Sequence, residues 1–571
     1  MLENTPIIQF ENYSFKYDAQ QKATLKNINL TIRKGEKILI AGPSGCGKST
    51  LIHSMNGLIP SSYRGEISGS LTIAGKNAGD LSIFDLSKIV GTVLQDSDGQ
   101  FVGLTVAEDI AFALENDCVP GLELHERVRE AAENVGISSH LHHSPNELSG
   151  GQKQKVSLAG VIVDNVDVML FDEPLANLDP AAGKYTIELI SEMQEKTGAA
   201  VVIVEHRLED VLWRDVDRIV LMSNGEIVMD APPEKLLATD LLSRNGIREP
   251  LYLTALKYAG VEVTSSMHPE SIQKLALDGI CKEKVRAWYR QTFRNEPKEK
   301  RADMISVENL QFSYPNGKKA IKGISAEIRK GEMVAIVGTN GAGKSTFSKL
   351  LCGFETQQEG IIRLKGENVE GLSIKERADH IGYVMQNPNK MISQIMIFDE
   401  VALGLRTRTV PEEEIRERVN STLQICGLWP FRNWPVSALS YGQKKRVTIA
   451  SILSMNPEVL ILDEPSAGQD YRHYTEIMEF LREINHLGVT VIMITHDLHL
   501  MLEYADRAIV FHDGRILADD TCASVLGNEE IVRRANLKKT SLYELAEQCG
   551  ITDSADFVQK FIDYERKVVR S

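Results

Sequence analysis

One large unit occurs twice in this chain. The segments at 33–51 and 329–347 read RKGEKILIAGPSGCGKSTL and RKGEMVAIVGTNGAGKSTF. The segments at 166–179 and 457–470 read VDVMLFDEPLANLD and PEVLILDEPSAGQD. The matched segments follow the same order in both copies, at nearly the same spacing. Because 571 residues exceed what one hydrophobic core usually holds, the sequence predicts a duplicated domain rather than a solenoid of short repeats.

Each copy contains the pattern of a phosphate-binding loop, GPSGCGKS at 42–49 and GTNGAGKS at 338–345. An apolar strand pattern precedes each loop and a helical pattern follows it, which is the context that this motif requires. Glycines allow backbone N–H groups to surround phosphates, the lysine reaches the β- and γ-phosphates, and the serine ligates Mg²⁺. The candidate ATP-binding residues are Gly42, Gly45, Gly47, Lys48, Ser49 and Thr50, and Gly338, Gly341, Gly343, Lys344, Ser345 and Thr346.

A pair of acidic residues ends a later strand pattern in each copy, Asp172 with Glu173 and Asp463 with Glu464. Acids at the carboxyl end of a strand face the ligand crevice of an open α/β sheet. We therefore expect each aspartate to hold Mg²⁺, and each glutamate to orient and deprotonate the attacking water.

One histidine follows the next strand pattern in each copy, His206 and His496. A single histidine is most often structural, but two at one topological position favour a shared function. We expect both histidines to hydrogen-bond the γ-phosphate and the attacking water, and so to be catalytic together with Glu173 and Glu464.

These motifs resemble those of the ATP-binding cassette (ABC) ATPases, and the resemblance covers nearly the whole chain. It implies an α/β fold of two tandem P-loop NTPase domains, each with a parallel-sheet core, an antiparallel β subdomain and a helical subdomain. In this family two cassettes pack head to tail and bury two ATP molecules, so both cassettes of this chain would form the ATPase dimer intramolecularly. The expected parts are a first cassette at 5–245, a linker at 246–302, a second cassette at 303–535 and a C-terminal helical extension at 536–571.

The resemblance also assigns binding roles outside the phosphate loops. Tyr17 and Tyr314 would stack on adenine; the alternative is that they pack as core or rim aromatics. Gln95 and Gln386 would touch Mg²⁺ and water while sensing a partner domain. The implied Mg²⁺ ligands are then Ser49, Gln95 and Asp172 in the first copy, and Ser345, Gln386 and Asp463 in the second.

The signature of the family, LSGGQ, contacts the γ-phosphate of ATP bound to the opposite cassette. It occurs here within NELSGGQKQKV at 146–156 and, altered, within SALSYGQKKRV at 437–447. Asp179 and Asp470 would lie in the loops that cross the dimer seam. The implied signature contacts are Ser149, Gly150, Gly151 and Gln152, and Ser440, Gly442 and Gln443.

Tyr441 stands where the first copy has Gly150. Under head-to-tail packing the second signature closes the site of Glu173, so this tyrosine affects closure of the first site only. A side chain must be accommodated where a glycine would let backbone approach the nucleotide. We expect the second site, which carries Glu464, to do most of the hydrolysis; the alternative is that the tyrosine is simply tolerated.

Composition disfavours several classes of protein. No apolar run approaches the roughly 18 residues needed to cross a bilayer, and the N-terminal residues do not resemble a signal peptide. The seven cysteines are scattered singly without a CxxC pair, which argues against a zinc site or a disulfide framework and fits a reducing cytosol. A formal net charge of −15 disfavours a nucleic-acid partner.

Three functions compete: the motor of a membrane importer, a soluble twin-cassette ATPase acting on the ribosome or nucleic acid, and a structural or repair ATPase with long insertions. The interval between Gln95 and Ser149 has room only for a normal helical subdomain, which disfavours the third. Translation-type cassettes carry an asparagine–histidine pair in the crossing loop, and LANLD at 175–179 and SAGQD at 466–470 lack that histidine. The soluble ATPase remains the alternative to the importer.

Two further segments, QDSDGQF at 95–101 and TVAEDIAFALENDCVP at 105–120, resemble the ATPases of energy-coupling-factor (ECF) importers. Such importers take up vitamins, vitamin precursors or metal ions, and a twin ATPase with LSYGQ is most similar to those assigned to thiamine or hydroxymethylpyrimidine. The resemblance implies a transmembrane coupling protein and a small membrane substrate-binding protein on separate chains. This chain would lie peripherally at the cytoplasmic face of the cell membrane, without a nucleic-acid partner.

We expect the coupling helices of the membrane partner to dock beside Gln95 and Gln386. An acidic groove would favour an arginine-bearing helix as its ligand. The acids expected in the first groove are Asp96, Asp98, Glu108 and Asp109.

Overall fold

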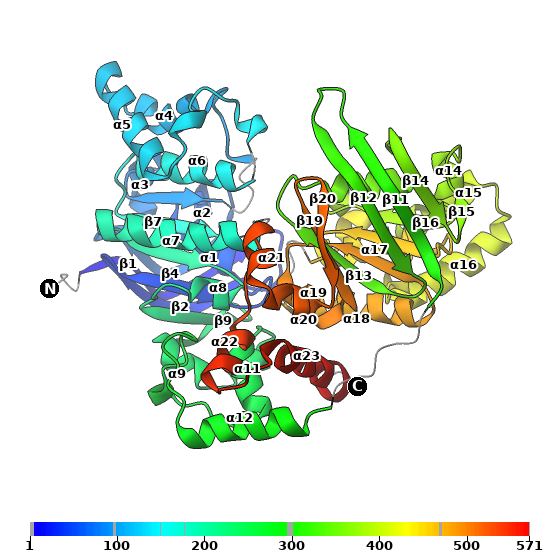
Figure 1. Cartoon of the computed structure of the whole chain (residues 1–571). Coiled ribbons are helices and arrows are strands. Elements are labelled where there is room, and N and C mark those ends of the chain that lie inside the picture. Colours follow the sequence, from blue (N-terminus) through cyan, green and yellow to red (C-terminus); the bar gives the residue numbers. More distant parts are fainter. Residues whose placement is uncertain are drawn as a thin grey trace. The chain divides into compact units, whose positions relative to one another are not determined.

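The computed structural model describes residues 5–94, 99–148, 150–175, 178–293, 301–466 and 471–569. The chain forms two compact units, Met1–Ala287 and Trp288–Ser571 (Figure 1). Each unit contains a four-stranded antiparallel sheet, a six-stranded and mainly parallel sheet, and a set of covering helices. The expected α/β fold with two tandem P-loop domains is thereby confirmed.

The first unit is built on a six-stranded sheet in the order β10-β9-β3-β8-β7-β6. Its strands are β3 (Lys37–Ala41), β6 (Val90–Val93), β7 (Val168–Asp172), β8 (Ala200–Val204), β9 (Arg218–Ser223) and β10 (Glu226–Ala231). All neighbours pair in parallel except β9 and β10. Strands β3 and β8 are buried along their whole length, because KILIA and AVVIV are continuous apolar runs that suit a sheet covered on both faces.

The second sheet of this unit has the order β2-β1-β4-β5. It consists of β1 (Pro6–Tyr17), β2 (Leu25–Arg33), β4 (Gly65–Ile73) and β5 (Lys76–Asn77). Phe10 and Phe15 of β1 share one hydrophobic core with Leu51 and Met55 of helix α1 (Lys48–Met55) and with Ile40 of β3. Helix α1 is therefore held by both sheets, which fixes the loop that precedes it.

The longer helices of the first unit begin with a layer of α4 (Val106–Asn116), α5 (Gly121–Asn134) and α6 (Gly150–Ile162), which pack on one another. Helix α7 (Pro180–Thr197) lies between β7 and β8 in the chain. The shorter helices are α2 (Leu58–Ser61), α3 (Ile83–Ser87), α8 (Leu208–Val211), α9 (Pro233–Leu237) and α10 (Leu241–Arg244).

The second unit repeats this topology, with a six-stranded sheet in the order β16-β17-β18-β13-β19-β20 and a four-stranded sheet in the order β12-β11-β14-β15. The six strands are β13 (Met333–Gly338), β16 (Ile381–Val384), β17 (Val459–Asp463), β18 (Thr490–Ile494), β19 (Arg507–His512) and β20 (Arg515–Asp520). The four strands are β11 (Asp303–Ser313), β12 (Lys319–Arg329), β14 (Glu359–Leu364) and β15 (Glu367–Asn368). Its helices up to β19 are α13 (Lys344–Cys352), α14 (Ile374–Arg377), α15 (Ile397–Thr407), α16 (Glu412–Ile425), α17 (Tyr441–Leu453), α18 (Tyr471–His486) and α19 (Leu498–Tyr504).

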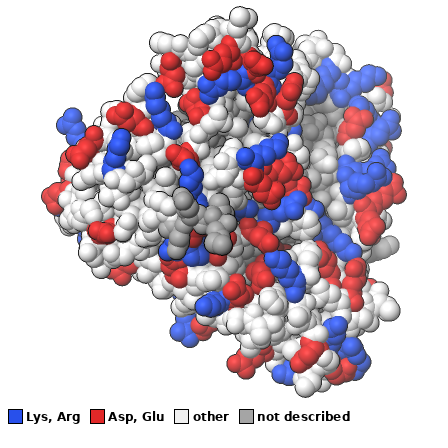
Figure 2. All heavy atoms as spheres, turned by 90° about the vertical axis from the view of Figure 1, so that its left-hand side faces the viewer, with Lys and Arg blue, Asp and Glu red and all other residues white. Residues whose placement is uncertain are grey.

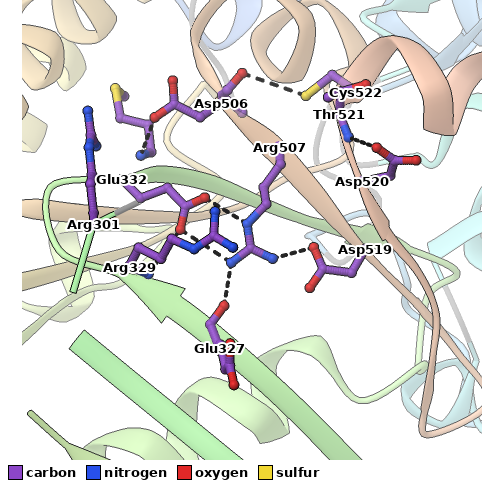
Figure 3. A network of polar contacts seen from close by, with 12 residues as sticks. Arg301, Glu327, Arg329, Glu332, Asp506, Arg507, Asp519, Asp520, Thr521 and Cys522 are labelled. Carbon is purple, nitrogen blue, oxygen red and sulfur yellow. Dashed lines mark hydrogen bonds and ion pairs between the residues drawn. The ribbon is translucent and has the colours of Figure 1, made fainter. Parts of the chain in front are cut away.

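An arginine at the start of a strand joins the two sheets of each unit. Arg507 of β19 donates from Nε to Glu332 at 2.7 Å, and its other nitrogens reach Asp519 of β20 and the carbonyl of Glu327 in β12 (Figure 3). Arg218 of β9 makes the corresponding set of bonds in the first unit. Charge-assisted bonds from one planar guanidinium to both sheets restrict the angle between them.

The segment expected as a linker contains α11 (Leu251–Tyr258), which is largely buried, and α12 (Gly279–Gln291). The chain continues after β20 with α20 (Cys522–Gly527), α21 (Glu529–Arg534), α22 (Ser541–Gln548) and α23 (Ser554–Tyr564). Trp288 in the last turns of α12 packs edge-on against Phe557 and Tyr564 of α23, with ring centroids 5.7 and 5.5 Å apart. Among the described helices, none combines the length and the apolar character that crossing a membrane requires.

Candidate nucleotide-binding sites

The first phosphate loop connects β3 to α1 in a conformation that requires glycine. Gly47 caps α1 with a φ of 108°, and a Cβ there would lie 2.8 Å from a methyl carbon of Leu25. A Cβ on Gly42 would lie 2.4 Å from the carbonyl oxygen of Met222. Lys48 begins α1 and turns its buried ammonium back over the loop, where it donates to the carbonyl of Gly42 at 2.8 Å.

The second phosphate loop, between β13 and α13, has the same conformation. Gly343 caps α13 with a φ of 104°, and a Cβ there would lie 2.6 Å from the carbonyl oxygen of Ala320. Lys344 donates to the carbonyls of Gly338 at 2.8 Å and Thr339 at 3.0 Å. Both loops therefore direct a lysine ammonium and a helix N-terminus to one point, where phosphate groups are favoured.

Tyr17 and Tyr314 lie beside the phosphate loops. The Tyr17 hydroxyl is 3.1 Å from the hydroxyl of Thr50 in α1, and the Tyr314 hydroxyl is 3.0 Å from that of Thr346 in α13. Tyr17 also packs edge-on against Phe15, with ring centroids 4.7 Å apart. Both rings are part-buried at the mouth of their loop, which is compatible with adenine stacking and with rim packing, so the adenine role stays a prediction.

The carboxylates expected to act on water meet the expected histidines in both units. Glu173 Oε1 lies 2.8 Å from His206 Nε2, and Glu464 Oε1 lies 3.3 Å from His496 Nε2. Glu173 and Glu464 have φ values of 50° and 47°, in the left-handed region that a residue with a side chain rarely adopts. The backbone N–H of Glu173 donates to Val204 of β8, so strand pairing holds this unusual conformation.

Burial shapes the ionisation of the acidic pairs. It raises the pKa of Asp172 to about 6, and the neighbouring Glu173 adds to the effect. Burial alone would also raise the pKa of Glu173, but the hydrogen bond from His206 and the charges of His206, Lys48 and Arg207 together hold that pKa below its usual value. In the second unit burial raises the pKa of Asp463 and, with the charge of Asp463 added, that of Glu464.

The donor set around each aspartate fits a magnesium ion. A buried carboxylate with a raised pKa gains from a nearby cation, and Mg²⁺ is usually held by one or two carboxylates together with phosphate oxygens. In the described part of the chain no three His, Cys, Asp or Glu side chains converge as they would in an all-protein metal site. Asp172 with Ser49, and Asp463 with Ser345, are thus suited to hold Mg²⁺ that a bound nucleotide shares.

A tyrosine that the sequence did not single out contacts the second site. Tyr383 at the end of β16 donates its hydroxyl to Asp463 Oδ2 at 2.9 Å. The first unit has Thr92 at the matching position of β6, and its hydroxyl is 3.3 Å from the side-chain amide of Asn56. Aligning IVGTV at 89–93 with HIGYV at 380–384 would have revealed the difference, although not the contact with Asp463.

The second signature forms the first turn of α17. Ser440 caps this helix by accepting from the N–H of Gln443 at 3.3 Å, and the Gln443 side chain returns a bond to the N–H of Ser440 at 3.0 Å. Gly442 is buried, whereas Tyr441 is 37% exposed and donates its hydroxyl to the carbonyl of Gln386 at 3.3 Å.

The first signature is described only in part. Gly150 and Gly151 begin α6, and the Gln152 amide lies 3.0 Å from His140 Nε2. Asp179 caps α7 by accepting from Ala182 at 2.9 Å. Gln95, Ser149 and Asp470 lie outside the described residues, and the closure of each site by the opposite signature stays a prediction.

Lys445, one turn after Tyr441, is a second residue that sequence reasoning missed. Its side chain is fully buried, and its ammonium donates to the carbonyl of Glu464 at 2.7 Å and to that of Gln386 at 3.3 Å. Burial lowers its pKa to about 8, against the opposing charges of Glu464 and Asp463. The first unit has Gln154 at this position.

Two of the acids expected in the docking groove bind backbone N–H groups in the loop before α4. Asp109 accepts from the N–H groups of Val102 at 2.8 Å and Gly103 at 3.0 Å, and Glu108 accepts from that of Leu104 at 2.9 Å. These two carboxylates are therefore occupied by the local backbone, while Val102 and Leu104 are 66% and 82% exposed. Asp96 and Asp98 lie outside the described residues.

Comparison with known proteins matches this geometry. The family model described as ABC transporter matches residues 25–176 and 321–467. A model described as ATP-binding cassette cobalt transporter matches residues 239–312, and a model of an AAA domain matches residues 432–503.

Two curated relatives carry the name of an ABC transporter ATP-binding protein. The one from Clostridium perfringens is 56% identical over 567 residues, and the alignment covers 99% of each chain. The one from Enterococcus faecalis is 56% identical over 564 residues, again with 99% of each chain covered. A solved structure of cbiO1 from Clostridium perfringens, titled as part of the ABC transporter complex cbiONQ, is 36% identical. That alignment covers 41% of this chain and 95% of the other, with a TM-score of 0.38.

Proposed function

Because the chain belongs to the ABC transporter family and carries two of its ATPase cassettes, we propose that it is the ATP-hydrolysing subunit of an ECF-type importer. Its partners are a transmembrane coupling protein and a small membrane substrate-binding protein on separate chains. It acts peripherally, at the cytoplasmic face of the cell membrane. The match of residues 239–312 to a model described for a cobalt transporter ATPase supports this class.

One observation carries the proposal of a membrane partner. Leu104, directly before α4, is 82% exposed, and Ile395, at the same position before α15, is 78% exposed. Each loop is fixed from behind by a carboxylate: Asp109 binds two of its N–H groups in the first unit, and Glu400 binds two in the second. An aliphatic side chain presented on a rigid loop, at one position in both units, favours docking of a partner at low entropic cost.

The docking test uses the double variant Leu104→Ser and Ile395→Ser, expressed together with the candidate membrane proteins. We expect the variant to co-purify with membranes far less than the unchanged chain while it still binds ATP. Leu487→Ser is the matched control, because Leu487 is 73% exposed in the loop between α18 and β18 and precedes neither α4 nor α15. Equal membrane recovery of the double variant and the unchanged chain would contradict the docking surface.

The chemistry follows from the residues around each phosphate loop. Lys48 and Lys344 replace their loop carbonyls by the β- and γ-phosphates, because a charged acceptor binds an ammonium more strongly than a neutral one. Glu173 is oriented by His206, which with Lys48 and Arg207 lowers the pKa of its carboxyl, and it accepts a proton from the attacking water. Glu464 has the same position beside His496. A bound Mg²⁺ would neutralise part of the phosphate charge and lower the pKa of the buried acids around it.

The transported substrate is a vitamin, a vitamin precursor or a metal ion. The likeness of LSYGQ at 439–443 to thiamine- and hydroxymethylpyrimidine-type ATPases favours the first two, whereas the model matched at 239–312 is described for cobalt. Substrate contacts belong to the separate membrane chain. Uptake of labelled thiamine, hydroxymethylpyrimidine and cobalt by cells that carry the complete complex distinguishes these substrates.

The alternative, a soluble ATPase acting on the ribosome or nucleic acid, requires a basic contact surface. Figure 2 shows basic and acidic side chains interspersed over the face that it views, and the net charge of the chain is −15. Neither observation favours a nucleic-acid partner.

A further inference from the structure

Two side chains of the second signature helix converge on one carbonyl oxygen. Tyr441 and Lys445 are four residues apart in α17 and therefore point to the same side of the helix. The Tyr441 hydroxyl and the Lys445 ammonium each lie 3.3 Å from the carbonyl oxygen of Gln386, in the loop after β16. Lys445 also donates to the carbonyl of Glu464 at the end of β17, at 2.7 Å. We call this set of three hydrogen bonds the α17 tie.

The α17 tie depends on a buried ammonium group, which would be unfavourable without hydrogen-bond acceptors. Lys445 is 0% exposed, and removing an ammonium from water costs much free energy unless its donors are satisfied. Two backbone carbonyls accept from the Lys445 ammonium: that of Gln386 in the loop after β16, and that of Glu464 directly after β17. Lys445 therefore joins three segments that are distant in sequence: α17, the loop of Gln386 and the end of β17.

The first unit has different residues at both positions. Gly150 has no side chain in place of Tyr441, and the neutral Gln154 stands in place of Lys445. The Gln154 amide donates to the carbonyl of Pro174, next to Glu173. A glutamine therefore suffices to join the signature helix to the strand end, and the tyrosine and lysine add a bond to the Gln386 loop.

We propose that Tyr441 and Lys445 are positioning residues, which hold the second signature to the Gln386 loop so that the two move together. This inference rests on the proposed function and on the predicted head-to-tail packing of its two cassettes, in which the second signature completes the first ATP site. Gln386 follows the strand beside Asp463 and so belongs to the second site. A change in the second site thus reaches the first through α17.

In the α17 tie, Tyr441 positions the second signature through its hydroxyl, whereas its ring could hinder closure of the first site. The variant Tyr441→Phe distinguishes these two roles. This variant keeps the ring and removes only the hydroxyl. We place it in the full-length chain on a Glu464→Gln background, where the first site alone hydrolyses ATP and the carbonyl of residue 464 is retained. Steady-state hydrolysis is then measured against ATP concentration without membrane partners. Lys445→Gln, which introduces the residue of the first unit, is measured in the same way.

Losing one neutral hydrogen bond should lower the kcat of the first site about two- to tenfold, and losing the ammonium should lower it by about tenfold or more. The KM for ATP should stay within about twofold, because the phosphate loop of the first site is untouched. The two changes together should cost less than the product of the single effects, since both side chains share one acceptor. Lys444→Gln is the matched control: it makes the same chemical change one residue earlier, where the lysine donates to the side chain of Asn389 at 3.4 Å.

An unchanged kcat for Tyr441→Phe would overturn the proposal, and it would do so even if Lys445→Gln failed to fold. A fall in kcat that Lys444→Gln reproduces, or that accompanies an equal change in KM, would also overturn it. Ser440→Ala on the same background tests the composite site itself. If that variant lost no activity, the predicted head-to-tail packing would be wrong independently of the tie.

Discussion

Replacing Tyr383 by phenylalanine should weaken Mg²⁺ binding at the second ATP site and leave the first site unchanged. The Tyr383 hydroxyl holds Oδ2 of Asp463 at 2.9 Å, whereas Thr92 occupies this position in the first unit. The substitution keeps the ring and its edge-on packing against Phe354, whose centroid is 5.9 Å away. Its effect is therefore confined to the hydrogen bonds of the hydroxyl, which reach Asp463 and Ser348.

The size of the effect on Mg²⁺ binding follows from the bond to Asp463. A hydrogen bond to a charged group contributes about 1.5–3 kcal/mol, and the lower value corresponds to about a tenfold change in an equilibrium constant. Loss of an outer partner of a metal ligand typically weakens metal binding by about 10–100-fold. Without the phenol the Asp463 carboxylate rotates more freely, and fixing it on the metal costs entropy. We expect the free Mg²⁺ needed for half-maximal hydrolysis at the second site to rise about tenfold.

The assay measures ATP hydrolysis against free Mg²⁺ on a Glu173→Gln background, where only the second site is active. The same Tyr383→Phe change on a Glu464→Gln background reports the first site and serves as the control. Half-saturation within about twofold of the parent chain at the second site would refute the assigned role of Tyr383. An equal shift at both sites would refute the confinement of the effect.

Two further predictions concern the balance of the sites and the C-terminal tail. Under the predicted head-to-tail packing, the signature that closes the first site has a tyrosine in place of glycine. Glu464→Gln should therefore abolish most ATP turnover of the full chain, whereas Glu173→Gln should leave a substantial part. Equal losses would contradict this asymmetry. Arg566 follows α23 and donates to the carbonyls of Glu503 and Ala505 at 2.8 Å each, which caps the end of α19, the helix that begins two residues after His496. Arg566→Ala should therefore destabilise the second unit by about 2 kcal/mol and lower its calorimetric melting temperature by a few degrees, and an unchanged transition would show that this cap is not needed.

The sequence by itself determined the duplicated cassette fold and the chemistry of the phosphate loops. Both loops are built from eight contiguous residues, so glycine conformation, lysine and serine could be interpreted without knowing the packing. The acids at the ends of β7 and β17 were equally predictable, because the carboxyl ends of parallel strands meet at one edge of a sheet. Their contacts with His206 and His496 follow from the neighbouring strands β8 and β18.

The tertiary structure alone decided which side-chain contacts distinguish the two units. The bond from Tyr383 to Asp463 spans 80 positions of the chain, and that from Lys445 to Gln386 spans 59. Nothing local selects such partners: the direction of each side chain is set by the strand or helix that carries it and by which backbone carbonyls burial leaves to be satisfied. The same reason explains why the sequence did not reveal the partners of Glu108, which we expected only as an acid of the docking groove. In the folded chain the N–H groups at the start of α4 take up its carboxylate, because helix ends leave donors that must be paired.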